Sequence, residues 1–144
     1  MEKHEQTKGL TIISPITKGD FKSAGEASSE IKNKLLQLGF PSNLTRRVAI
    51  ATYEAEMNLV IHSDGGKIRA EINPGSVFIE VTDVGPGIPN LHMAMQKGFS
   101  TASEEVREMG FGAGMGLPNM RNCASKFEII SVVGKGTTIK MLIS

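Results

Sequence analysis

The chain has 144 residues, of which 40% are hydrophobic and 22% are charged, as in an ordinary soluble globular domain. Its net charge of +1 argues against a nucleic-acid-binding surface. No apolar run reaches the roughly 20 residues needed to cross a bilayer, and the polar N-terminus MEKHEQTKG lacks the apolar core of a signal peptide. We therefore expect a cytoplasmic protein with no membrane and no nucleic-acid partner. Its one cysteine, Cys123, is expected to pack in a helix rather than to act as a nucleophile.

Three elements are predicted in the first half of the chain. Residues 10–16, LTIISPI, form a predicted strand, and Pro15 restricts its far end to the edge of a sheet. Apolar residues at spacings of three and four then predict a helix over about 20–38. A second, longer helix is predicted over about 42–62, before a pair of glycines.

Hairpins dominate the second half. The predicted elements there are strands at 67–73 and 77–83, a short helix at 90–97, a helix at 117–126, and strands at 127–133 and 137–143. We therefore expect an α/β (α+β) two-layer sandwich, in which helices cover one face of a mixed, mainly antiparallel sheet. Residues 9–144 are expected to form one domain behind a flexible N-terminus at 1–8.

A dense glycine run, GFGAGMGL at 110–117, precedes the predicted third helix. It matches neither the GxGxxG turn of a dinucleotide fold nor a Walker A loop. So many glycines cost conformational entropy on folding, which something must offset. Their backbone N–H groups and the adjoining helix dipole suit a phosphate chain, although a flexible hinge would use the same residues. The residues alone leave both interpretations open.

A carboxylate, Asp83, ends a predicted apolar strand and is followed by Gly85 and Gly87 in the sequence DVGPGIP. The glycines would let the backbone turn under a flat ligand while the acid accepts a hydrogen bond from an exocyclic amine. A turn that only terminates the strand has the same composition, so this motif also has two interpretations.

Polar residues recur along one face of the long helix. Glu54, Asn58 and His62 are spaced by four residues, beside apolar positions such as Leu59. Glu and Asn are poor choices for a buried stripe unless they bind something. A carboxylate can accept a proton, and a carboxamide oxygen can bind Mg²⁺ beside phosphates. His62 is expected to pack or hydrogen-bond at the helix end, because no second His or Cys is spaced to complete a metal site with it.

The motifs occur in a distinctive order: ExxxNxxxH, DxGxGI, GFST, GxGxGL and GxGTT. In this order they resemble the histidine-kinase-like, Bergerat-fold (GHKL) ATPases, over nearly the whole chain from about residue 10. Within that group the chain looks most like the stand-alone anti-sigma-factor serine/threonine kinases, although its glycine run is longer than in many of them. The resemblance implies the Bergerat ATP-binding fold, with an ATP lid at about 98–116.

The resemblance also implies roles for single residues. Glu54 matches the general base, Asn58 matches the asparagine that holds Mg²⁺, and Asp83 matches the acid that recognises the adenine amino group. The other implied nucleotide-site residues are Gly85, Gly87, Ile88, Phe99, Ser100, Thr101, Gly110, Gly112, Gly114, Met115, Gly116, Leu117 and Thr138.

The activity that the resemblance implies is phosphorylation of a small regulatory protein, an anti-sigma antagonist or a sigma factor, by ATP and Mg²⁺. Two alternatives remain: a non-catalytic ATP/ADP-responsive module that controls a sigma factor or its antagonist, and a detached sensor-kinase ATPase domain. Glu54 favours the kinase, because ATP binding alone needs no base at that position. A homodimer is expected from the same resemblance.

Overall fold

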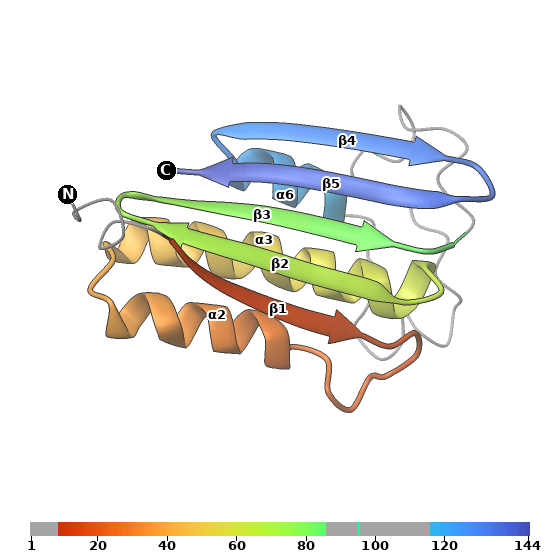
Figure 1. Ribbon diagram of the computed structural model, residues 1–144, viewed down its shortest axis with the longest axis horizontal. Coiled ribbons are helices and arrows are strands. Elements are labelled where there is room, and N and C mark those ends of the chain that lie inside the picture. The colour runs from red at the N-terminus through yellow and green to blue at the C-terminus, as the bar shows by residue number, and fades with distance from the viewer. Residues whose placement is uncertain (1–8, 86–94, 96–115) are drawn as a thin grey trace.

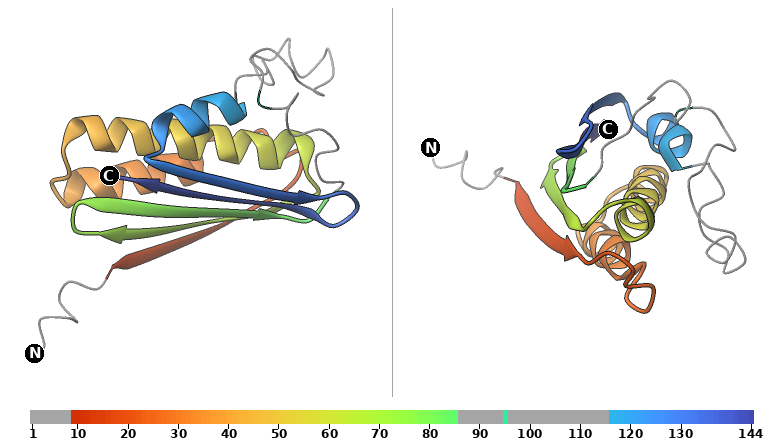
Figure 2. Two further views of the ribbon diagram at one scale, coloured as in Figure 1. Left: turned by 90° about the horizontal axis from the view of Figure 1, so that it is seen from above. Right: turned by 90° about the vertical axis from the view of Figure 1, so that its right-hand side faces the viewer.

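The computed structural model of the chain describes residues 9–85, 95 and 116–144. The elements within these ranges are β1 (Leu10–Ile16), α2 (Glu26–Gln37), α3 (Ser42–His62), β2 (Gly66–Asn73), β3 (Ser76–Asp83), α6 (Gly116–Cys123), β4 (Lys126–Val132) and β5 (Gly136–Ile143). The strands form one sheet in the order β1-β2-β3-β5-β4, and each neighbouring pair is antiparallel (Figure 1). Helices α2, α3 and α6 cover one face (Figure 2). The predicted two-layer fold is confirmed.

The core lies between this sheet and α3. Strand β3 alternates between buried and partly exposed residues, and its buried members Val77, Ile79 and Val81 point toward the helices. From the other layer, α3 contributes a fully buried stripe that includes Val48 and Ala55. The site described below therefore rests on the longest helix and the central strands.

Most elements agree with the sequence within one or two residues, but two helices are shorter than predicted. Helix α2 begins at Glu26 rather than near residue 20, because Gly25 has a left-handed backbone (φ 99°) and the N–H of Ser23 bonds to Asp20 Oδ1 at 3.2 Å in a turn. Helix α6 ends at Cys123, because the N–H of Ser125 already bonds to the sheet. The helix predicted at 90–97 lies outside the described residues except for residue 95.

A buried acid ties α2 to α3. Glu56 is only 2% exposed, and its two carboxylate oxygens accept the backbone N–H groups of Ala27 and Ser28, each at 3.1 Å. Helix α2 has no side-chain cap of its own, so this carboxylate from α3 satisfies two of its first-turn donors.

Among the described helices, none of α2, α3 and α6 is long and apolar enough to span a membrane.

Candidate functional site

Two polar side chains from different helices meet beside the core. Asn119 of α6 donates a hydrogen bond from Nδ2 to Oε2 of Glu54 on α3, at 2.9 Å. Helix α6 is held in place by the buried side chain of Met120 and by Arg47, whose Nη1 donates to the carbonyl of Cys123 at 3.2 Å. Glu54 Oε1 accepts no hydrogen bond from the described residues. Asn119 thus anchors one of the two carboxylate oxygens.

One turn further along α3, Asn58 lies against the first residue of α6. A Cβ atom added to Gly116 would lie 3.0 Å from Asn58 Oδ1, so a larger residue there would push the carboxamide slightly aside. Asn58 is half-buried and makes no hydrogen bond to another described residue. A partly buried carboxamide with no partner among these residues fits a ligand contact, and its oxygen is of the type that binds Mg²⁺.

The carboxylate of Asp83 is held by the last hairpin. Its Oδ1 accepts the backbone N–H of Thr137 at 2.7 Å, and a Cβ on Gly136 (φ 134°) would overlap the Asp83 carbonyl. Burial raises the pKa of Asp83, the Thr137 N–H acts in the opposite direction, and the charge of Asp64 raises the pKa further. Oδ2 accepts no hydrogen bond from the described residues, so it can serve as an acceptor for a ligand amine.

The turn after Asp83 is fastened to the end of α3. The N–H of Asp64 bonds to the carbonyl of Val84 at 2.9 Å, and the N–H of Val84 bonds to the carbonyl of Gly65 at 3.1 Å. Gly85 packs directly on this segment, since a Cβ there would lie 3.2 Å from the Asp64 nitrogen. These bonds bring the Asp83 strand end to the C-terminal end of the helix that carries Asn58.

His62 lies at this same end of α3 and is half-buried. Burial lowers its pKa, because desolvation disfavours the charged imidazolium. No cluster of metal-binding side chains occurs among the residues that the structure describes.

The threonine whose backbone N–H bonds to Asp83 is Thr137, the chain neighbour of Thr138, whose place near the adenine stays a prediction. Strand β5 turns Thr137 and Ile139 toward the helices, whereas Thr138 pairs with Thr82 on the open face of the sheet. The Thr137 hydroxyl is buried and shares a hydrogen bond of 2.8 Å with Ser131 Oγ.

Comparison with known proteins decides the family. A family model described as histidine kinase-, DNA gyrase B- and HSP90-like ATPase matches residues 44–144, which run from the first turn of α3 through β5. The chain belongs to this ATPase family.

Sequence relatives of this ATPase chain include a protein kinase and anti-sigma factors. It is 30% identical over 115 residues to the serine/threonine-protein kinase RsbT of Bacillus subtilis, covering 77% of this chain and 80% of the kinase. It is 37% identical over 99 residues to the anti-sigma F factor of a Thermoanaerobacter species, covering 65% of this chain and 66% of that factor, just under two thirds of its length.

Solved structures support the ATPase fold. The RsbU and RsbW domains of a Mycobacterium tuberculosis protein align with a TM-score of 0.60 at 18% identity, over 95% of this chain and 32% of the longer protein. A chain of the SiaB-SiaC complex from Pseudomonas aeruginosa aligns with a TM-score of 0.61 at 13% identity, over 99% of this chain and 94% of that one. At these identities the likeness concerns the fold alone.

In the ATPase domain, the described site residues come from three places: α3, the strand end with its turn, and the start of α6. Leu117, also implied by the resemblance, is a buried core residue that anchors α6. The remaining implied residues lie outside the described residues, as does most of the segment at about 98–116 that was expected to form an ATP lid. They are Gly87, Ile88, Phe99, Ser100, Thr101, Gly110, Gly112, Gly114 and Met115.

Asn119 is the site residue that sequence reasoning missed. It follows the glycine run by three positions, between the buried residues Pro118 and Met120, and its partner Glu54 is 65 residues away in the chain. A polar residue between buried neighbours was the available signal, but nothing local indicated the partner.

Proposed function

We propose that this ATPase domain is an ATP- and Mg²⁺-dependent protein serine/threonine kinase that phosphorylates a small regulatory protein, an anti-sigma antagonist or a sigma factor. The observation that carries the proposal is the anchored carboxylate of Glu54, one helical turn from the carboxamide of Asn58, which has no hydrogen-bond partner in the part of the chain that the structure describes. The similarity to a relative named as a serine/threonine-protein kinase supports it.

Asp83 would recognise the adenine. The Thr137 N–H fixes one carboxylate oxygen, so the other can accept a hydrogen bond from the exocyclic amine of the base. The carboxyl must be ionised to keep both oxygens as acceptors, and its raised pKa means that acidification removes this form sooner than for an exposed aspartate.

Asn58 and the start of α6 would bind the phosphates of ATP. The Asn58 oxygen fits Mg²⁺, which when bound would neutralise phosphate charge. Gly116 begins α6 beside Asn58, so the positive end of this helix suits the same anionic chain.

Glu54 would act as the general base. A hydroxyl of the partner protein forms the new O–P bond with the γ-phosphoryl group, the bond between that group and ADP breaks, and the hydroxyl proton passes to Glu54 Oε1. Asn119 holds Oε2, which restricts the rotation of the carboxylate and keeps Oε1 oriented.

A second candidate is a nucleotide-responsive binding module that controls a sigma factor or its antagonist without phosphoryl transfer. The relatives named anti-sigma F factor favour it, because the same pocket would serve a binder. The expected homodimer remains a prediction, which light scattering of the purified chain would test.

The test combines nucleotide binding with phosphoryl transfer. Calorimetry should show that the wild-type chain binds ATP and that Asp83→Asn does not, while γ-labelled ATP should label a candidate sigma factor or antagonist from the source organism. ATP binding without labelling of any candidate would favour the binding module. Failure of the wild-type chain to bind adenine nucleotides would refute both functions.

A further inference from the structure

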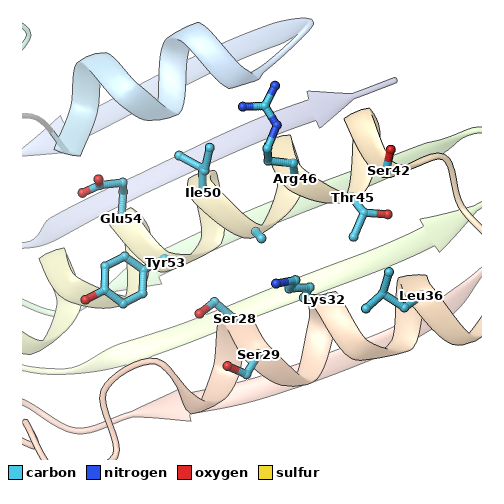
Figure 3. A pocket seen from close by; sticks show the side chains of 11 residues that line it. Ser28, Ser29, Lys32, Leu36, Ser42, Thr45, Arg46, Ile50, Tyr53 and Glu54 are labelled. Carbon is cyan, nitrogen blue, oxygen red and sulfur yellow. The ribbon is translucent and has the colours of Figure 1, made fainter.

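A surface groove runs between α2 and α3, with a volume of about 630 Å³. Side chains from both helices line it, including Lys32 and Leu36 from α2 and Arg46, Tyr53 and Glu54 from α3 (Figure 3). It is therefore separate from the Asp83 end of the nucleotide site, but it ends at the side chain proposed as the base.

The groove is positively charged. Lys32 and Arg46 are exposed, and neither forms an ion pair or a hydrogen bond with another described residue. Glu54 is the only acid among the groove residues that the structure describes, and one of its oxygens is already bonded to Asn119. Two cations with no acidic partner in the described part of the chain, beside one partly satisfied acid, favour a negatively charged occupant.

The groove also presents apolar anchors. Leu36 is 54% exposed, Tyr53 is 40% exposed and Ile50 is 37% exposed, and all three line it. The Tyr53 ring reaches across to the start of α2, where a Cβ on Gly25 would lie 3.7 Å from the ring. Tyrosine and arginine together with aliphatic side chains are typical of protein-binding surfaces rather than of small-anion sites.

We propose that this groove docks the phosphoacceptor segment of the partner protein, with the acceptor hydroxyl at Glu54 and acidic side chains at Lys32 and Arg46. This rests on the proposed kinase function. Arg46 and Glu54 are eight residues apart on α3, which is about 12 Å along the axis. An extended segment covers that distance in about four residues, so the preferred substrate carries its acid about four positions from its serine or threonine.

The experiment uses the full chain and fluorescein-labelled 13-residue peptides with a central serine. One peptide carries two aspartates about four residues from the serine, and the other carries two lysines there. Fluorescence anisotropy should show at least about tenfold tighter binding of the aspartate peptide, and the double variant K32E/R46E should reverse this preference. The control K126E/K135E changes the net charge equally at exposed positions outside the groove and should leave the preference intact.

Two results would overturn the docking site: equal affinity of the wild-type chain for both peptides, or equal behaviour of K32E/R46E and the control. A loss of binding in added salt with no effect of Tyr53→Ala would identify a non-specific anion surface and also reject it. Transfer of labelled phosphate to the serine is measured separately. Selective binding of the aspartate peptide without phosphate transfer would therefore support the docking groove and count against the kinase function.

Discussion

Asn119 Nδ2 lies 2.9 Å from Glu54 Oε2, which joins the helix that follows the glycine run to the helix that carries the proposed base. The two residues are 65 positions apart in the chain. Anything that shifts the start of α6 therefore also changes the orientation of Glu54. This hydrogen bond links the position of α6 to the carboxylate of the proposed base.

Replacing Asn119 by Ala removes that bond without touching Asp83, the residue proposed to recognise the adenine. We expect kcat for phosphoryl transfer to fall about tenfold, since a positioned hydrogen bond to a carboxylate contributes about 1–2 kcal/mol, while ATP affinity is unchanged. Steady-state kinetics measures kcat, and calorimetry measures the ATP affinity of the same variant. A rise in the ATP dissociation constant with unchanged kcat would instead assign Asn119 to nucleotide binding.

Gly116→Ala tests the close approach to Asn58. The added Cβ would lie 3.0 Å from Asn58 Oδ1 and displace the carboxamide, so ATP affinity in Mg²⁺ should fall several-fold. The midpoint temperature of thermal unfolding should stay the same or rise slightly, because Ala is a better helix former than Gly. Calorimetry with Mg²⁺ and with EDTA provides the comparison. An unchanged affinity in Mg²⁺ would show that Asn58 does not depend on this contact.

Glu56→Gln should destabilise the fold by about 2–4 kcal/mol, because the amide group cannot accept both N–H groups at the start of α2 and leaves a buried donor unpaired. Urea denaturation measures the change. Glu128→Gln, at an exposed position of β4, is the matched control and should stay within about 0.5 kcal/mol of wild type. Equal losses of stability in the two variants would contradict the assignment of Glu56 as the cap of α2.

His62 should make stability depend on pH. Burial lowers its pKa in the folded state below the ordinary 6.5, so below that pH the unfolded chain binds the proton more readily. Its contribution is complete above about pH 6.5 and is lost as the pH falls toward the folded pKa. Urea denaturation at pH 7.5 and 5.5 should show a smaller loss of stability for His62→Gln than for wild type. Equal losses of stability for wild type and His62→Gln would show that another group causes the pH dependence.

Regular features of the fold were predictable, because they depend on residues close together in sequence. The helix at 42–62 and the strand at 10–16 carry clear periodicity and end at strong signals such as Gly65. The start of α2 was misjudged because apolar spacing continues through a left-handed glycine that ends the regular backbone.

Contacts between distant segments were not predictable. Glu56 looked like one more acid on a helix, yet it caps another helix about 28 residues earlier in the chain. The bond from the Thr137 N–H to Asp83 depends on how β5 lies beside β3, and the bond from Asn119 to Glu54 depends on the packing of α6 on α3. Sequence reasoning thus identified chemically suited residues more readily than the side chains that hold them in place.

The most direct test of the account is single-turnover transfer of labelled γ-phosphate to the partner protein by Glu54→Gln, alongside wild type and the Glu128→Gln control. Gln keeps the size and the contact distance but cannot take a proton, so transfer should fall by at least about 100-fold, with ATP affinity and the control unchanged. Transfer at the wild-type rate by Glu54→Gln would contradict the assignment of Glu54 as the base.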